Sequence, residues 1–271
     1  MWVAKVLHSW CKIRRMLFRT LTKPQFRALV ERFISEHEVI GPRRVCLDKE
    51  ARPVHQLLPV SGFDELELDY EMAEYSAKTY FLPFEEQLSS FQLGEWDWAQ
   101  EIRYRVQPRA IIGLRACDIN ALVRLDKVFA ANLFPSPYYL ARRKNTFVVG
   151  LDHMPCDGGF CRSVDTDTVT HGFDLFLTDL GDRYFAAINS DRAFTALKQA
   201  GAREITDEDT NDYLVERQRM AQGFGPEVNV HNLANLLDIE FESDVWQRWG
   251  KKCLSCGSCA MSCPTCYCYG V

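Results

Sequence analysis

Hydrophobic residues recur at helical spacing near the N-terminus and then gather into short runs. Between Leu21 and His37 apolar side chains recur at helical spacing, Thr22 can cap the first turn and Pro24 fits within it, which predicts a helix over 21–37. Two short apolar runs follow, at 45–47 and 54–58, with a charged turn between them. Runs of this length are typical of strands.

The next segment is polar and irregular. Residues 61–76 are rich in Asp and Glu and predict a solvated connection or a short helical turn, not a metal site. Residues 78–93 contain Pro83, after which a short helical pattern runs through Phe84 and Leu88.

Strands and helices then alternate in the pattern of an α/β unit. The predicted elements are, in order, a strand at 109–114, a helix at 118–130, a strand at 147–151 and a hairpin of strands at 174–178 and 184–188. Helices are predicted at 191–200, 206–221 and 231–248.

The order of elements predicts an α/β (α+β) fold. We expect a mixed-sheet domain over residues 21–224, preceded by a basic extension at 1–20 and followed by a helical, cysteine-bearing segment at 225–271. The boundary is placed near Gly223–Pro226, where small and helix-breaking residues gather.

Composition narrows the class of protein. The chain has 271 residues, of which 47% are hydrophobic and 25% charged, as in an ordinary globular protein. A net charge of -5 gives no general reason to expect a nucleic-acid partner. No apolar run approaches the roughly 20 residues of a membrane span, so no transmembrane segment is expected.

The first residues admit two interpretations. Residues 1–19 contain five basic side chains, no acidic one and an apolar stripe, as in an amphipathic helix that touches a membrane or a partner. The interpretation that we favour is a start of translation at Met16. The pair Arg14-Arg15 resembles an export signal, but no hydrophobic region follows it. We therefore expect a cytoplasmic protein with reduced cysteines.

Cysteines are concentrated at the C-terminal end, where six of the chain's eleven lie between Cys253 and Cys268. The first four follow the spacing C-x2-C-x2-C-x3-C-P, with which bacterial ferredoxins bind iron–sulfur clusters. Three thiolates on a Gly- and Ser-bearing loop can bind three corners of one cluster, and the fourth, directed by Pro264, can reach a second. The candidate cluster ligands are Cys253, Cys256, Cys259 and Cys263, and Cys266 and Cys268 are further candidate metal ligands.

Zinc and disulfides are the alternatives at this segment. A zinc site typically places two C-x2-C pairs more than about a dozen residues apart. A disulfide framework requires an oxidising compartment. The spacing therefore favours a ferredoxin-like iron–sulfur segment and electron transfer, and the alternative function is a zinc- or thiol-stapled interaction module.

A second group of cysteines follows the predicted strands. Cys117 comes just after the strand at 109–114, and Cys156 and Cys161 come after the strand at 147–151. If these strands are parallel neighbours, the three thiols converge at one edge of the sheet. Asp118 would then cap the following helix and offer an oxygen ligand. Two interpretations stay open: an extra cluster with one non-cysteine ligand, or three unpaired thiols.

Four stretches resemble the iron–sulfur beta subunits of cytoplasmic sulfhydrogenases and the A subunit of anaerobic sulfite reductase. The stretches are GLRACDINALVRLDKVF at 113–129, YYLARRKNTFVVGLD at 138–152, GFDLFLTDLGDRY at 172–184 and CLSCGSCAMSCPTCYCYGV at 253–271. The resemblance runs from about Leu21 to the end of the chain and includes KTYFLPFEEQL at 78–88.

The resemblance implies one or two [4Fe-4S] clusters and no catalytic residue on this chain. It implies a relay of electrons between a flavin-containing subunit that reacts with NAD(P)H and a catalytic subunit, either a siroheme sulfite reductase or a nickel–iron hydrogenase. In agreement, the sequence contains no dinucleotide-binding glycine motif after a strand and no Walker loop.

The chain departs from the family in two places. In the family a second cysteine run lies further on and completes a two-cluster module, whereas this sequence stops at Val271. We expect either a truncated product or split reading frame, or a substitution of the missing ligand by Cys263, Cys266 or Cys268. In the middle loop the family has a cysteine after the strand and then Cys-Phe-Cys. Here Asp152 and His153 stand near the first position, Gly159 replaces the middle cysteine, and Cys156 is the candidate replacement.

Overall fold

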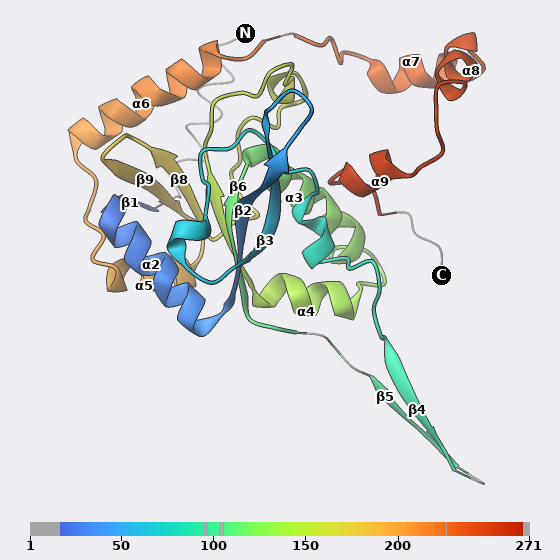
Figure 1. Cartoon of the computed structure of the whole chain (residues 1–271), viewed down its shortest axis with the longest axis horizontal. Helices are drawn as coiled ribbons and strands as arrows, with labels where there is room; N and C mark the ends of the chain where they lie inside the picture. The colour runs from blue at the N-terminus through green and yellow to red at the C-terminus, as the bar shows by residue number, and fades with distance from the viewer. Residues whose placement is uncertain (1–16, 95–96, 103, 105, 226, 268–271) are drawn as a thin grey trace.

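The structure, a computed structural model, describes residues 17–94, 97–102, 104, 106–225 and 227–267. A seven-stranded sheet lies at its centre, in the order β1-β9-β8-β7-β6-β2-β3 (Figure 1). Its strands are β1 (Leu17–Thr22), β2 (Glu38–Leu47), β3 (Pro53–Val60), β6 (Arg109–Leu114), β7 (Thr146–Leu151), β8 (Leu175–Asp179) and β9 (Arg183–Ile188).

The middle of this sheet is parallel. β2, β6, β7 and β8 pair in parallel, whereas β3 pairs antiparallel with β2, and β9 pairs antiparallel with both β8 and β1. Because parallel strands end at the same edge, the loops after β6 and β7 lie next to each other, at the edge where α/β sheets bind ligands.

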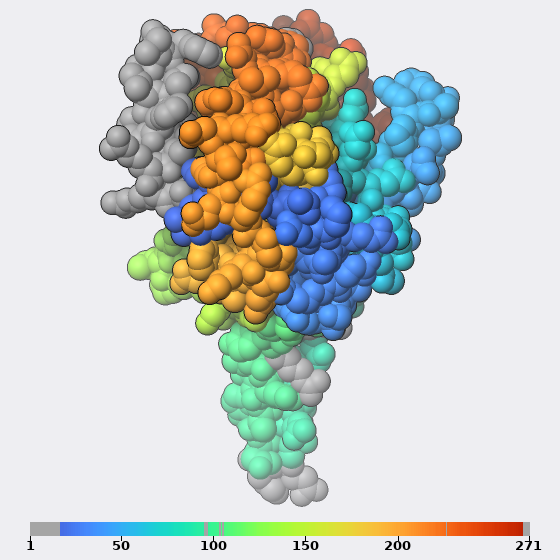
Figure 2. All heavy atoms as spheres, turned by 90° about the vertical axis from the view of Figure 1, so that its left-hand side faces the viewer, coloured from blue at the N-terminus to red at the C-terminus, as the bar shows by residue number. Residues whose placement is uncertain are grey.

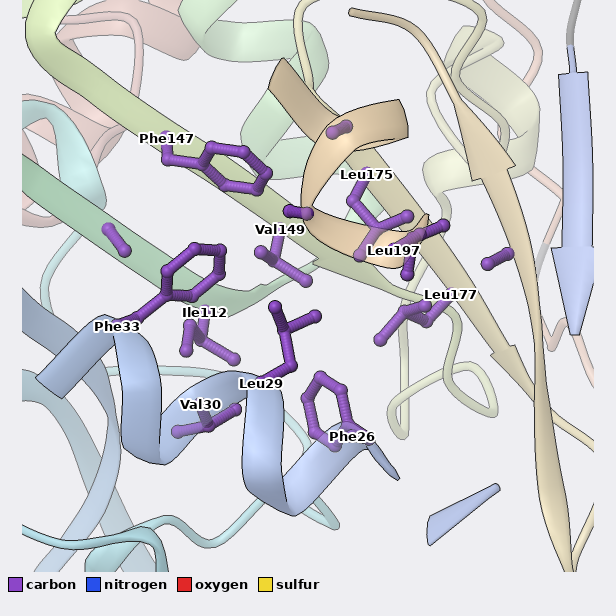
Figure 3. Close-up of a cluster of buried hydrophobic side chains, with 14 of the residues drawn as sticks. Phe26, Leu29, Val30, Phe33, Ile112, Phe147, Val149, Leu175, Leu177 and Leu197 are labelled. Atoms are coloured by element: carbon purple, nitrogen blue, oxygen red, sulfur yellow. The ribbon is translucent and has the colours of Figure 1, made fainter. Parts of the chain in front are cut away.

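Helices cover both faces of the sheet. The described helices are α2 (Lys23–Glu36), α3 (Ala116–Phe129), α4 (Pro137–Asn145), α5 (Asp191–Gln199), α6 (Asp207–Gln222), α7 (Leu233–Ile239), α8 (Asp244–Gly250) and α9 (Ser258–Ser262), of which α7, α8 and α9 lie away from the sheet (Figure 1). The 3-10 turns are η1 (Phe63–Glu65), η2 (Ala77–Tyr80) and η3 (Cys161–Val164). Leu29 of α2 and Ile112 of β6 share one core (Figure 3), and Leu122 of α3 and Ile111 of β6 share the other. Successive residues of β6 therefore point to opposite faces, as strand geometry requires.

Two regions stand apart from this body. β4 (Ser89–Leu93) and β5 (Trp98–Ile102) form a separate two-stranded hairpin that projects from the domain (Figures 1 and 2). After α6 the chain leaves the sheet through α7 and α8 and returns to the side of α3 at α9 (Figure 1). None of the described residues between 227 and 262 is buried.

The predicted α/β fold class is confirmed. The strands predicted at 109–114, 147–151, 174–178 and 184–188 are β6, β7, β8 and β9, each within one residue at either end. The predicted cap of α2 is also present, because Thr22 and Gln25 exchange the hydrogen bonds of a capping box.

The N-terminal predictions need correction. The predicted helix over 21–37 loses its first two residues to β1, which also runs across the boundary predicted between residues 20 and 21. The strand predicted at 45–47 is longer, since β2 begins at Glu38. Pro42 is tolerated within β2 because pairing with β6 covers only Glu38 to Ile40. The interpretations of residues 1–16, including a start at Met16, lie outside the described residues.

Two predicted helices were wrong. The segment 78–93 forms η2 and β4 and contains no α-helix. The segment 231–248 divides into α7 and α8, because α7 ends at Ile239 and the Ser243 side chain caps a new helix. The boundary predicted near Gly223–Pro226 stays a prediction.

Candidate functional site

Three cysteines meet at the carboxyl edge of the sheet. Cys117 lies in the first turn of α3, directly after β6, and Cys156 and Cys161 follow β7. All three side chains line a cavity of about 30 Å³, together with those of His153 and Arg217. β6 and β7 are parallel neighbours. The structure therefore brings the three thiols together, and their role as ligands stays a prediction.

A hydrogen bond couples two of these thiols. Because the Cys117 thiol donates this hydrogen bond, the pKa of Cys161 is lowered to about 6. The same hydrogen bond raises the pKa of Cys117, and burial raises it further. Burial raises the pKa of Cys156. The lowered pKa favours the thiolate form of Cys161, which is the form that binds metal or reacts with electrophiles.

Asp118 does not cap α3, contrary to the prediction. The helix begins at Ala116 with Arg115 as its N-cap residue. Asp118 lies in the first turn, where its carboxylate accepts the backbone N–H of Arg115. Burial raises the pKa of Asp118 to about 6. Its position still places it next to Cys117 in the sequence.

Asp152 and His153 are the polar residues that directly follow β7. Asp152 accepts hydrogen bonds from Thr178 at 2.6 Å and from Arg217 at 2.8 Å, and it is 8% exposed. Both carboxylate oxygens are thus occupied. Burial lowers the pKa of His153 to about 4, with the charge of Arg115 acting in the same direction, so His153 is neutral at pH 7.

Gly159 leaves room for the sulfur of Cys156. A Cβ atom at position 159 would stand 2.9 Å from both the Sγ atom and the carbonyl oxygen of Cys156. These contacts are shorter than real Cβ atoms make, so a side chain at 159 would displace Cys156. The Cys156 sulfur therefore lies beside the space that a side chain at 159 would occupy.

The second group of thiols lies on the terminal cysteine segment, residues 253–267. Cys253 and Cys256 precede α9, Cys259 lies within it, and Cys263 follows it. Cys253, Cys256 and Cys259 are exposed, whereas Cys263 and Cys266 are half-buried. Cys268 lies outside the described residues.

Backbone geometry curls the loop before α9. Ser255 and Gly257 both have left-handed backbone, with φ of 55° and 75°. The Ser255 amide donates to the Cys253 sulfur at 3.3 Å, and the hydroxyl of Ser258 lies 3.3 Å from the Cys256 sulfur. Amide and hydroxyl donors of this kind stabilise thiolates.

Hydroxyl groups lower the pKa of two cysteines in this segment. Ser258 lowers the pKa of Cys256. Thr265, whose hydroxyl lies 3.4 Å from the sulfur, lowers the pKa of Cys263, and the charge of Lys78 adds to this effect. Both shifts favour the thiolate that a metal requires.

Within the part of the chain that the structure describes, no three His, Cys, Asp or Glu side chains are grouped to hold one metal ion. The thiols of the terminal cysteine segment, which have amide and hydroxyl partners, are donors of the kind that an iron–sulfur cluster requires. A cluster at this segment stays a prediction.

Two buried cations near the cysteines were missed by sequence reasoning. Lys78 contacts the terminal cysteine segment, and its only signal was its place in the stretch KTYFLPFEEQL. Arg115 is 3% exposed, stacks 3.9 Å above the Tyr70 ring and donates to the carbonyl oxygens of Leu68 and Tyr70. It lines a cleft of about 1110 Å³ at the same edge of the sheet.

The fold and its cysteines define a class of protein: an α/β domain with thiols at its sheet edge and a ferredoxin-like cysteine run beyond it. No protein-family model matches the chain. Over 214 residues, 78% of this chain, it is 36% identical to sulfhydrogenase 2 subunit beta of Pyrococcus furiosus. The chain belongs to this family of sulfhydrogenase beta subunits, as its four stretches predicted.

The match leaves part of the relative uncovered, since it extends over 63% of that protein's length. A search of the described residues finds no helix with the length and apolar character that a membrane crossing needs.

Proposed function

We propose that this chain is an electron-transfer iron–sulfur subunit of a multi-subunit oxidoreductase. The observation that carries the proposal is the geometry of the terminal cysteine segment. Its C-x2-C-x2-C-x3-C-P run lies on an exposed, curled loop whose sulfurs already have amide and hydroxyl partners. Similarity to a sulfhydrogenase beta subunit supports the same function.

In this proposal Cys253, Cys256 and Cys259 hold one [4Fe-4S] cluster. Cys263, Cys266 or Cys268 provides its fourth ligand or serves a second cluster. When bound, the cluster supplies a site that accepts and releases one electron. The protein's part is to fix the thiolates and to leave the loop accessible to a partner's redox centre, which the exposure of the three leading cysteines favours.

The proposed partners follow from the family. The Pyrococcus protein is named as a subunit, which supports a complex with other chains. We propose a flavin-containing subunit that reacts with NAD(P)H on one side of the relay. On the other side we propose a catalytic subunit, a nickel–iron hydrogenase or a siroheme sulfite reductase, in the cytoplasm.

A further cluster is proposed at the sheet edge, with Cys117, Cys156 and Cys161 as ligands and Asp118 as the non-cysteine candidate. Two observations support it. The Cys156 sulfur lies beside the space that a side chain at 159 would occupy, so it can replace the family's middle cysteine. Cys117 and Cys161 line the same small cavity as Cys156.

Metal analysis of anaerobically purified protein tests the proposed function. We expect iron and acid-labile sulfide, with broad visible absorption that dithionite bleaches. Cys256→Ser should lose iron and the cluster signal while the sheet stays folded. Cys46→Ser is the matched control, because Cys46 is an exposed cysteine on β2, outside both groups. Zinc without iron or sulfide would instead support the interaction module.

The sheet-edge cluster has its own test. Cys117→Ser should remove a spectroscopic signal different from the one that Cys256→Ser removes. If Cys117→Ser leaves both iron content and spectrum unchanged, the three thiols at the sheet edge bind no cluster.

A further inference from the structure

Lys78 connects the α/β domain with the terminal cysteine segment. It lies in η2 and is 6% exposed. Its ammonium group donates to the carbonyl oxygens of Ala260 at 2.6 Å, Cys263 at 2.7 Å and Cys266 at 3.0 Å. An ammonium group has three N–H donors, so these carbonyls satisfy all of them.

These three hydrogen bonds exist only when the terminal cysteine segment is packed against the α/β domain. Burying an ammonium group is costly unless it is fully hydrogen-bonded. The three acceptors come from the end of α9 and from the turn after it, and all point at one nitrogen. Removing the charge would leave three carbonyls facing an apolar side chain.

The stretch that bears Lys78 is itself firmly held. Phe81 is fully buried against Tyr139, with ring centroids 6.2 Å apart, and its carbonyl accepts a hydrogen bond from Arg142 at 2.8 Å. A second contact lies close by, since the Tyr267 ring meets Phe129 of α3 edge-on at 5.6 Å. Lys78 therefore projects from a rigid part of the domain.

We propose that Lys78 is a positioning residue that fixes the turn bearing Cys263 and Cys266 on the α/β domain and holds a positive charge beside the terminal cluster. The first half depends only on the contacts above. The second half rests on the proposed function. It assigns a role to the stretch KTYFLPFEEQL, which contains no cysteine.

The charge has a definite effect on a bound cluster. When a cluster accepts one electron from an external donor its net charge becomes more negative, so a fixed cation nearby stabilises the reduced form. Lys78→Met should therefore lower the midpoint potential. Lys78→Arg keeps the charge and should restore the potential toward that of the wild type.

Hydrogen exchange of the metal-free protein tests the contact of Lys78 with the terminal cysteine segment without reference to iron. Amides of Ala260, Met261, Cys263 and Cys266 are hydrogen-bonded within the segment. Loss of the charged donor should raise their exchange rate about tenfold or more in Lys78→Met, because hydrogen bonds from a charged donor are stronger than those between neutral groups. Lys78→Arg should retain partial protection.

Controls keep this test decisive. Lys198→Met removes an exposed lysine of α5 and should change nothing in the terminal peptide. Peptides from β6 and β7 serve as internal references in each spectrum. Lys78→Gln is the second variant should Lys78→Met not fold. Equal exchange of the terminal peptide in the wild type and in a folded Lys78 variant overturns the proposal.

The two proposals fail in different ways. Suppose that wild-type protein binds no iron but Lys78→Met still raises the exchange rate of residues 260–266. Lys78 then fixes the turn as proposed, and the cluster proposal is wrong. If iron binds and the potential is identical in wild type and Lys78→Met, Lys78 does not act on the cluster. A lower potential in Lys78→Met that Lys78→Arg reverses supports both halves.

Discussion

At the scale of single residues, Asp209 pairs with two arginine side chains of the α/β domain. It is completely buried and accepts hydrogen bonds from Arg183 at 2.7 Å and from Arg203 at 2.6 and 2.9 Å. It also accepts the backbone N–H of Thr206, which closes the capping box of α6. Asp209→Asn should lower the free energy of unfolding by about 1–3 kcal/mol, because the buried side chain would lose the charge that accepts hydrogen bonds from Arg183 and Arg203.

The same contact predicts a dependence on pH. Arg203 lowers the pKa of Asp209 below its ordinary value, so the carboxylate stabilises the folded state. That contribution is complete above about pH 5, where the unfolded carboxyl is also ionised, and it declines as the pH falls further. Urea unfolding should show a smaller difference between wild type and Asp209→Asn at low pH than at neutral pH. Asp207→Asn, an exposed acid in the same turn, is the control and should differ little from wild type.

Gly159 offers a residue-scale test of the sheet-edge site. Gly159→Ala should displace Cys156, because the new Cβ would stand 2.9 Å from its sulfur and its carbonyl oxygen. We expect Cys156 of the metal-free variant to be alkylated several times faster than in the wild type, as measured by mass spectrometry. Gly225→Ala is the control, since nothing lies within 4 Å of a Cβ there. An unchanged rate would mean that the loop adapts without moving Cys156.

At the scale of elements, the hairpin of β4 and β5 differs from the strands of the main sheet. Cross-strand pairing places Phe91, Leu93, Trp98 and Ile102 on one face, and all four are exposed. Exposed side chains contribute little to folding. The double substitution Phe91→Thr with Trp98→Thr should therefore change the free energy of unfolding by less than about 0.5 kcal/mol.

A buried strand gives the contrasting result. Ile111 of β6 is fully buried, and Ile111→Ala should cost about 2–5 kcal/mol in the same urea experiment. If the hairpin variant is as unstable as Ile111→Ala, the apolar face of the hairpin is covered in solution.

Elements with one dominant local signal could be predicted from the sequence. β6 and β7 read as continuous apolar runs because helices cover both faces of the strands, and Thr22 marked the start of α2 as its cap. β2 was underestimated because Gly41 and Pro42 normally interrupt regular structure, yet here they lie within an extended strand.

The sites divide in the same way. Cysteine spacing drew attention to the terminal thiols, and the place of Cys117, Cys156 and Cys161 after two predicted strands drew attention to the others, since a thiol is identified by its residue type. Lys78 could not be assigned a role, because its acceptors are backbone carbonyls as far as 188 residues away. A carbonyl group is the same in every residue, so such a contact leaves no pattern in the sequence.

At the scale of the whole molecule, the α/β domain has buried apolar cores, whereas the terminal cysteine segment makes few contacts with that domain. The sheet and its helices bury two apolar cores, whereas none of the described residues between 227 and 262 is buried. Folding of the domain should therefore be independent of metal bound to the terminal cysteine segment, unlike that of a zinc finger, which unfolds without its ion.

Removing iron from the proposed cluster with a chelator tests this independence. We expect the main calorimetric transition to shift by no more than about 2 °C, because the cores that determine it contain no cluster ligand of the terminal segment. Hydrogen exchange should change unevenly within that segment. Residues 253–259 should lose protection, since they have no anchor to the domain other than a cluster, whereas 260–266 should keep theirs through Lys78. Unfolding of the sheet on chelation would show that the metal supports the whole fold. An equal loss of protection across 253–266 would show that the hydrogen bonds of Lys78 form only when the metal is bound.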